Sequence, residues 1–360
     1  MSEKRVTISD IARESGASPT TVSLVLRDKG GIGMDTRERV LAAAQTLGYE
    51  RKHSRRSRGE RDVTTAALLF RANSPNPTGG SPGVNPFYSW VLTGVEAVAR
   101  GKRISLLYGT VAINESNEIV DIPHHLLGDG TDGIIVVGAF HDDAVLALAG
   151  STSRPMVLVD GPGSSPRFDV VASDNVQGTR TVTNHLIEAG HTHIALLTRV
   201  VAANPNFAAR EAGYRLALED HGLTPVVGRI EQWNVSEAID RIFEERPTVT
   251  AIVCVNDQFA LDAGNELECR GIRVPDDISL VGFDNTDHST AFRPGLTTMN
   301  VDKVGMGRLA ITLLDYRLQW PDSAPASIIL TPSLTIRGSV ASPDLNRQPI
   351  SPPPGTESFR

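Results

Sequence analysis

The sequence predicts a small all-α head followed by a large two-lobed α/β domain that carries two parallel sheets. Residues 7 to 49 place apolar side chains at spacings of three or four, the periodicity of helices. From residue 64 onward, short apolar runs alternate with longer amphipathic stretches, which is typical of parallel strands covered by helices on both faces. Because this pattern continues for about 275 residues, two lobes with a cleft between them are expected rather than a single sheet.

Three short helices are predicted in the head. Gly16 separates the first two, and Ser18 followed by Pro19 is a start signal, because a capping hydroxyl precedes a proline at the first helical position. Two short helices joined by a glycine-containing turn form a helix-turn-helix. The apolar faces are formed by Ile8, Ile11 and Ala12, by Val22, Val25 and Leu26, and by Val40, Leu41, Ala44 and Leu47.

A basic linker follows the head. Half of residues 51 to 62 (RKHSRRSRGERD) are Lys or Arg and almost none are apolar, so this segment cannot form part of a buried core. It is compatible with a solvated tether or with a hinge that contacts phosphates. Residues 1 to 62 hold 13 basic and 9 acidic residues, a net charge of +4, whereas residues 63 to 360 hold 22 and 33, a net charge of −11, which together give the −7 of the chain. This asymmetry is expected if the head meets nucleic acid and the remainder repels it.

The larger domain is predicted from its apolar runs and the helices between them. Residues 341 to 360, with SPPPG and no periodicity, are predicted to be a disordered tail. The predicted helices lie near residues 87 to 100, 175 to 189, 208 to 221, 235 to 245 and 257 to 270. The predicted strands are 66 to 70, 104 to 108, 133 to 138, 156 to 160, 193 to 197, 251 to 255 and 278 to 284.

Several function classes find no support in the sequence. The two cysteines, Cys254 and Cys269, lack the spacing of a zinc site, and the histidine pairs do not form a convincing metal site either. The G-x-G-x-x-G of residues 128 to 133 precedes a predicted strand instead of following one, so it is not a dinucleotide fingerprint. We therefore expect no metal, no cofactor and no enzyme activity. Without a signal peptide or an apolar run of membrane-spanning length, a cytoplasmic protein with no membrane partner is expected.

The second helix of the head is the first candidate site. Its initial turns present Ser18, Thr20, Thr21 and Ser23, small hydroxyl side chains that can approach bases and phosphates in a major groove. The same hydroxyls are compatible with a role limited to capping and solvating the helix.

The second candidate site is the interlobe cleft. In parallel α/β sheets, ligands bind beyond the carboxyl ends of the strands, and polar residues follow several predicted strands. Carboxylates and an amide there suit a ligand rich in hydroxyl groups. Two alternatives stay open, because Asp257 is also compatible with capping the next helix and Asp284 with closing a turn. The strand-end residues are Asp160, Asn256, Asp257 and Asp284.

Residues 6 to 49 resemble the head of the LacI/GalR family, including Thr21-Val22-Ser23 of the second helix and the Thr-Arg-Glu-Arg-Val that starts at Thr36. The similarity continues in order to about residue 340. Its further motifs include Asn85-Pro86-Phe87-Tyr88, Asp132-Gly133-Ile134-Ile135, Ser173-Asp174-Asn175, Arg210 with Gly213-Tyr214, Val255-Asn256-Asp257-Gln258, Val274-Pro275-Asp276-Asp277 and Leu296-Thr297-Thr298.

The resemblance implies a sequence-specific transcription regulator, expected to be a repressor, that acts as a homodimer or as a tetramer on double-stranded operator DNA. It implies a head of residues 1 to 50, a hinge of 51 to 62, and a periplasmic-binding-protein-like effector and dimerisation domain of 63 to 340 with two Rossmann-like sheets. Lobe 1 is expected to comprise about 63 to 161 and 291 to 320, and lobe 2 about 162 to 290 and 321 to 340.

The resemblance also assigns DNA-contacting positions. Thr7, Ser9, Thr36 and Tyr49 are implied at phosphates or in support of the fold, and Pro19, Thr20, Leu24 and Arg27 are implied to face bases. Two positions depart from the family. Leu24 stands where many members place an arginine that reads guanine, and it can only touch a thymine methyl. Arg58 stands where members carry a leucine that wedges into the minor groove, so a sharp DNA kink is not expected.

For the effector, the resemblance implies contacts from Asp160, Arg210, Asn256 and Asp284, with Phe87 and Trp233 as platforms for a sugar ring. Trp233 is also compatible with packing alone. A sugar is expected rather than a purine or a phosphorylated metabolite, because acids outnumber bases among these contacts. Two rival functions are not supported by the sequence. A transport-type binding protein would need a secretion signal, an enzyme would need a catalytic constellation, and neither is found.

Overall fold

The computed structural model describes residues 6–26, 32–47, 63–73, 86–114, 118–128, 130–161, 165–199, 204–231 and 233–344. The chain divides into two compact units, Met1–Arg61 and Asp62–Arg360. The predicted hinge of residues 51 to 62 lies outside the described residues. So do residues 345 to 360 of the predicted tail, but residues 341 to 344 are described, and Ala341 N donates to Ser279 Oγ at 3.0 Å. The predicted tail therefore began too early.

The first unit is a three-helix head, as the sequence predicts, with α1 (Ile8–Ser15), α2 (Pro19–Leu26) and α3 (Met34–Thr46). Gly16 ends α1 in the left-handed conformation with φ of 66°, which a residue without Cβ adopts at little cost. One buried residue set from all three helices forms the core of the head: Ile11, Ala12, Val22, Val25, Val40, Ala43 and Ala44.

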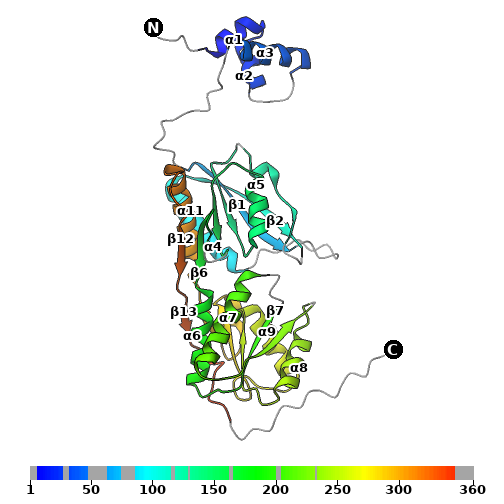
Figure 1. Cartoon of the computed structure of the whole chain (residues 1–360), viewed down its shortest axis with the longest axis vertical. Helices are drawn as coiled ribbons and strands as arrows, with labels where there is room; N and C mark the ends of the chain where they lie inside the picture. The colour runs from blue at the N-terminus through cyan, green and yellow to red at the C-terminus, as the bar shows by residue number, and fades with distance from the viewer. Residues whose placement is uncertain are drawn as a thin grey trace, which may run out of the picture. The chain divides into compact units, whose positions relative to one another are not determined.

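The first lobe of the second unit is built on a seven-stranded sheet with the order β12-β6-β5-β4-β1-β2-β3 (Figure 1). β1 lies between β4 and β2 and is parallel to both. β3 pairs antiparallel with β2 at one edge, so the sheet is mostly rather than wholly parallel. The strands are β1 (Thr65–Asn73), β2 (Ser105–Ile113), β3 (Ile119–Asp121), β4 (Gly133–Val137), β5 (Met156–Val159), β6 (Asp169–Ser173) and β12 (Ser327–Leu330).

Both faces of this sheet are covered. Along β1, Leu68 belongs to the buried cluster that includes Val91 and Val95 of α4 (Pro86–Lys102), whereas Leu69 packs with Leu148 of α5 (Asp142–Gly150). Alternate residues of a strand point to opposite faces, so a strand buried on both sides reads as a continuous apolar run. The long helix α11 (Lys303–Gln319) packs beside α4, and the short η1 (His124–Leu126) follows β3.

The second lobe has a six-stranded sheet with the order β13-β11-β10-β9-β7-β8, in which β13 pairs antiparallel with β11. Helices α6 and α7 pack against each other, and α8 and α9 do the same (Figure 1). The strands are β7 (Ile194–Arg199), β8 (Val226–Ile230), β9 (Ala251–Cys254), β10 (Ser279–Asp284), β11 (Thr297–Asn300) and β13 (Ser333–Thr335). The helices are α6 (Asn175–Glu188), α7 (Pro205–Asp220), α8 (Val235–Glu245), α9 (Asp257–Cys269) and α10 (Asp287–Ala291).

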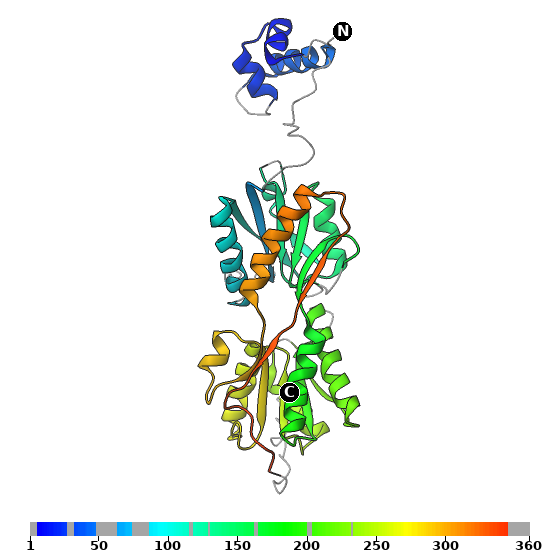
Figure 2. The ribbon, with the colours of Figure 1, turned by 90° about the vertical axis from the view of Figure 1, so that its left-hand side faces the viewer.

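The chain passes between the lobes at places that differ from the predicted boundaries. In the described residues it crosses after β6, between β11 and α11, and between β12 and β13, and Figure 2 shows the last crossing as a strand running from one lobe to the other. Residues 169 to 173 and 327 to 330 therefore belong to lobe 1, and residues 297 to 300 to lobe 2. The predicted lobe boundaries were wrong here because strand pairing decides membership: Val171 pairs with Ile328, and Val281 pairs with Thr297.

Candidate functional site

Helix α2 of the head turns a polar face outward. Thr21 N donates to Ser18 Oγ at 3.0 Å, so the start signal predicted from Ser18 and Pro19 is confirmed. Val22 and Val25 are buried in the core of the head. The residues of α2 that the sequence assigned to DNA lie away from this core: Pro19 and Thr20 are exposed, as is Ser18 before them, and Thr21, Ser23 and Leu24 are half-buried.

The other predicted DNA contacts lie at the ends and surfaces of α1 and α3. Thr7 caps α1, because Asp10 N donates to Thr7 Oγ1 at 3.3 Å and Thr7 N donates to Asp10 Oδ2 at 2.9 Å. Ser9 is exposed in the first turn of α1, and Thr36 is half-buried in α3. Arg27, Tyr49 and Arg58 lie outside the described residues. All of these DNA contacts stay predictions.

The second unit contains a cavity of about 280 Å³ lined by both lobes. It lies beyond the carboxyl ends of strands, where ligand sites of parallel α/β sheets form, and its volume is close to the lower end for small-molecule sites. Lobe 1 contributes Arg71, Ala72, Pro86 and Tyr88. Lobe 2 contributes Arg199, Asn204, Phe207, Trp233, Asn256, Gln258, Phe259, Asp284, Thr286 and His288.

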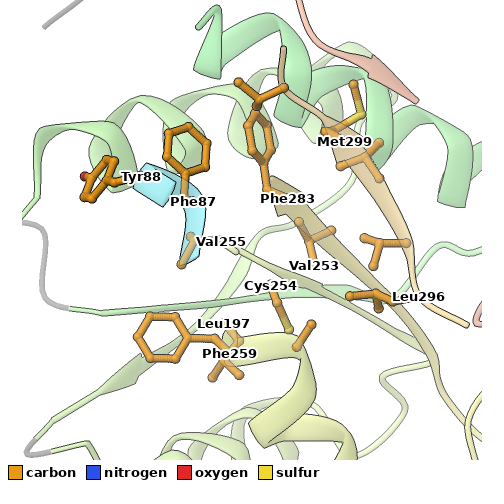
Figure 3. Close-up of a cluster of buried hydrophobic side chains, with 14 of the residues drawn as sticks. Phe87, Tyr88, Leu197, Val253, Cys254, Val255, Phe259, Phe283, Leu296 and Met299 are labelled. Carbon is orange, nitrogen blue, oxygen red and sulfur yellow. The ribbon is translucent and has the colours of Figure 1, made fainter. Parts of the chain in front are cut away.

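The predicted effector contacts fall into two groups. Trp233, Asn256 and Asp284 line the cavity. The other three are not among its lining residues: Phe87 is 4% exposed, Arg210 is 4% exposed and Asp160 is 7% exposed. Figure 3 shows the Phe87 ring in a buried cluster together with Phe283 and Val255, so this ring packs the junction of the lobes and is not an open platform.

Arg210 holds the wall of the cavity from behind. Its Nη2 donates to Asp284 Oδ1 at 3.0 Å, its Nη1 to the carbonyl oxygen of Val255 at 2.6 Å, and its Nε to Asn175 Oδ1 at 2.7 Å. Arg210 is therefore paired with the carboxylate of Asp284, and the alternative that Asp284 only closes a turn is wrong. The guanidinium also lies 3.8 Å from the centre of the Phe283 ring.

Asp160 joins the two lobes. At the end of β5 it has φ of 61°, and its Oδ2 accepts from Tyr88 OH of lobe 1 at 3.1 Å. Its Oδ1 accepts from Asn206 Nδ2 of lobe 2 at 2.8 Å. Burial raises the pKa of Asp160 to about 7, and the nearby Arg210 charge opposes that rise. A carboxyl group that titrates near neutrality thus links the two lobes. It is bonded to Tyr88, which lines the cavity, but does not line the cavity itself.

Asn256, not Asp257, caps α9: Phe259 N donates to Asn256 Oδ1 at 2.9 Å. The capping alternative for Asp257 is therefore wrong. Asp257 instead accepts from Thr286 N and from Thr298 Oγ1, both at 2.6 Å, and so fixes the loop after β10 to β11. Burial, followed by the charge of Asp284, raises its pKa to about 7.

The strand-end rule also identifies two arginines that the sequence analysis did not single out. Arg71 follows the apolar run of β1 directly, and Arg199 is the last residue of β7. The Arg199 guanidinium lies 4.0 Å from the centre of the Trp233 ring, which is 57% exposed and 6.3 Å from the Phe259 ring. The described lining thus carries two arginines and one carboxylate, so the excess of acids that favoured a sugar is not found in the cavity wall.

A helix-turn-helix head joined to a two-lobed domain with a cavity at its strand ends defines a ligand-responsive DNA-binding regulator. Comparison with protein families is consistent with this class. Residues 7–52 match the family described as bacterial regulatory proteins of the lacI family, and residues 183–340 match a periplasmic binding protein-like domain.

Relatives and solved structures match nearly the whole chain. The HTH-type transcriptional repressor PurR of Aliivibrio fischeri is 31% identical over 346 residues, which cover 93% of this chain and 98% of that protein. Catabolite control protein A of Priestia megaterium is 28% identical over 91% of this chain and 96% of that protein. A complex of the regulator CelR with cellobiose has a TM-score of 0.66 at 26% identity, covering 93% of this chain and all of that one. The lac repressor dimer bound to operator and the anti-inducer ONPF has a TM-score of 0.64 at 25% identity, covering 94% and all of the respective chains.

The chain belongs to the lacI family of bacterial regulatory proteins. It is a DNA-binding transcriptional repressor with an effector-binding domain. Within the described ranges, no helix is long and apolar enough to cross a membrane. Those same ranges hold no group of three or more His, Cys, Asp or Glu side chains suited to a metal ion.

Proposed function

We propose that this repressor is a cytoplasmic homodimer that binds a roughly palindromic operator through α2 and releases or tightens on it when a small effector occupies the interlobe cavity. Among the predicted contacts in and just before α2, Ser18, Pro19 and Thr20 are exposed and Thr21, Ser23 and Leu24 are half-buried, whereas Val22 and Val25 belong to the buried core. In that arrangement, hydroxyl groups and the Leu24 side chain meet base edges and phosphates, and the symmetry of the dimer is repeated in the operator.

The observation that carries the gating is that both lobes line one cavity and that Asp160 bonds across the lobes beside it. A ligand that contacts both lobes binds the open and closed arrangements with different affinities, and gating requires that DNA also binds them differently. We take the ligand-free dimer as the repressing form and the effector as an inducer. Linkage also permits the opposite sign, in which the effector is a corepressor.

The effector is proposed to be a small molecule with a ring, with a sugar preferred over a purine. The exposed face of Trp233 and the half-buried ring of Phe207 are surfaces on which a ring can lie. The structural relatives include a complex of the regulator CelR with cellobiose, a ring-bearing sugar, which supports this preference.

The test is binding of the purified full chain to its own upstream DNA, compared with a random duplex of equal length, by fluorescence anisotropy at moderate salt. We expect at least about 1,000-fold preference for the operator. Thr20→Ala should weaken operator binding by about 1–3 kcal/mol, whereas Thr290→Ala, an exposed threonine of the second unit, should not. Equal affinity for both duplexes, with and without candidate ligands, contradicts the proposal.

A further inference from the structure

The charges around the cavity are unevenly balanced. Arg71 from lobe 1 and Arg199 from lobe 2 both line it, and His288 adds a third basic side chain. Asp284 is the one carboxylate among the described lining residues. Because a guanidinium keeps its proton at any physiological pH, two positive charges face this space permanently.

Asp284 has cationic partners behind the cavity wall. Its carboxylate accepts from Arg210 at 3.0 Å, and Lys303 Nζ donates to its backbone oxygen. Lys303 is 7% exposed and also donates to the carbonyl oxygens of Asn285 and Val301, both at 3.2 Å. The acid is therefore matched by buried cations behind it, and among the described lining residues basic side chains outnumber this one carboxylate.

The two arginines also influence each other. Burial lowers the pKa of Arg71, and the positive charge of Arg199 lowers it further, while Tyr88 and Asp160 act in the opposite direction. Of these two, Tyr88 has its pKa raised well above its usual value, so it is neutral, and Asp160 shares its carboxylate between Tyr88 and Asn206. Like charges held close together in a partly desolvated wall favour a bound anion.

The rest of the wall suits a ring. The Arg199 guanidinium stacks over Trp233, which fixes both groups at the same side of the cavity. Phe207 lies 6.0 Å from Phe259 and extends the aromatic surface beyond Trp233. A ligand that lies on these rings can place a charged substituent against the stacked arginine.

We propose that the effector is an organic anion: a ring compound whose carboxylate or phosphate group binds between Arg71 and Arg199 while its ring lies against Trp233 and Phe207. This inference rests on the proposed function, in that the cavity is the effector site. It narrows the proposed class of ring compounds, sugars included, to those that carry an acidic or phosphate group.

Calorimetric titration of the full chain with matched probes tests this assignment. The pairs are glucose with glucuronate, glucose with glucose 6-phosphate, ribose with ribose 5-phosphate, and adenosine with adenosine 5′-monophosphate. We expect the anionic member of at least one pair to bind at least about tenfold tighter, and that advantage to shrink when salt is raised. The glucuronate and phosphate arms distinguish a carboxylate from a phosphate as the bound group.

Two variants check where the anion binds. Arg199→Gln should reduce the anionic advantage to less than about threefold, with thermal unfolding used to confirm that the variant folds. Arg273→Gln is the matched control, because Arg273 is an exposed arginine of the same unit that pairs with Asp277 and does not line this cavity. It should leave the advantage unchanged.

Neutral members that bind as tightly as their anionic partners overturn the inference, and so does failure of every anion to bind at millimolar concentration. Operator binding measured in parallel separates this from the proposed function. If a neutral ligand changes operator affinity, the regulator proposal stands and the anion inference fails. If anions bind but operator affinity does not respond to any ligand, the gating proposal fails instead.

Discussion

Buried ionic side chains near the cavity are held in compensated sets. Arg210 shows this most clearly, because its side chain satisfies a carboxylate, a carbonyl oxygen and an amide oxygen that come from three different elements. An ion pair out of water is stable only when its remaining hydrogen-bonding capacity is also used. The first role of Arg210 is therefore to stabilise the cavity wall. The sequence analysis assigned it only a contact with the ligand.

Replacing Arg210 with alanine should lower the free energy of unfolding of the second unit by about 3–5 kcal/mol, because the buried carboxylate of Asp284 would lose its ionic partner. Urea unfolding followed by tryptophan fluorescence measures this. Arg215→Ala is the matched control on the same helix and should cost less than about 1 kcal/mol, since Arg215 is half-exposed and its partner Glu211 keeps the ion pair with Arg229. Equal losses for both variants would show that the Arg210 pair is not buried as described.

Asp257 should make stability depend on pH. Its pKa in the folded protein is about 7, raised first by burial and then by Asp284, against about 3.9 in an unfolded chain. The folded state therefore binds more protons between these values, and stability should fall as pH rises from about 4 to about 7 and stay lower above that.

Between pH 5 and 8, the free energy of unfolding of the wild-type chain is expected to decrease by on the order of 1–3 kcal/mol, and this decrease should be smaller in Asp257→Asn. Thermal unfolding over this pH range measures both. Asp160 has a similarly raised pKa, so part of the pH dependence should remain in the variant. An identical pH profile in both proteins would mean that Asp257 titrates well below neutrality.

At the scale of elements, lobe 1 depends on a close crossing of α4 and α11. A Cβ on Gly94 would lie 2.0 Å from the carbonyl oxygen of Val304, and one on Gly307 would lie 2.0 Å from that of Val91. The two glycines thus let each helix approach the backbone of the other. This contact positions α11. Lys303, the first residue of α11, in turn donates to the backbone oxygen of Asp284 in the cavity wall.

Gly94→Ala should force the helices apart and destabilise the chain by about 1–3 kcal/mol or more, because backbone atoms cannot move aside. Gly101→Ala, in the same helix with nothing within 4 Å, should be neutral or stabilise by up to about 1 kcal/mol. Thermal unfolding distinguishes the pair. If Gly94→Ala proved as stable as Gly101→Ala, the helices would not cross at this distance.

Predictability also differed between elements. The central strands and helices α4, α6, α7, α8 and α9 were found because they carry clear apolar runs or amphipathic spacing. Helix α11 was missed although it has 17 residues, and so were β6, β8 and β11. Their sequences, DVVAS, VVGRI and TTMN, contain only short or interrupted apolar runs, whereas the equally short β5 and β9 are apolar throughout.

At the scale of the whole molecule, the charge is divided between a basic N-terminal part and an acidic remainder. Phosphate contacts release counterions from DNA, so affinity should fall steeply with salt. Arg58→Ala should weaken operator binding and reduce the slope of log affinity against log salt by about 1 if Arg58 contacts a phosphate. Anisotropy titrations from 50 to 200 mM salt measure this slope. The control variant Arg273→Ala, in the acidic part of the chain, should leave the slope unchanged. An unaltered slope for Arg58→Ala would contradict a contact between the hinge and a phosphate.

The sequence by itself determined the helix-turn-helix head, the two-lobed α/β class and the family, because these depend on local periodicity, capping residues and ordered motifs. It also located the cavity in principle, since polar residues at strand ends are visible in one dimension. Only the tertiary structure decided which lobe β6, β11 and β12 join, that Arg210 and Phe87 lie behind the cavity wall, and that Arg71 and Arg199 face it. Strand pairing and burial join residues more than a hundred positions apart, and no local pattern encodes which of those partners meet.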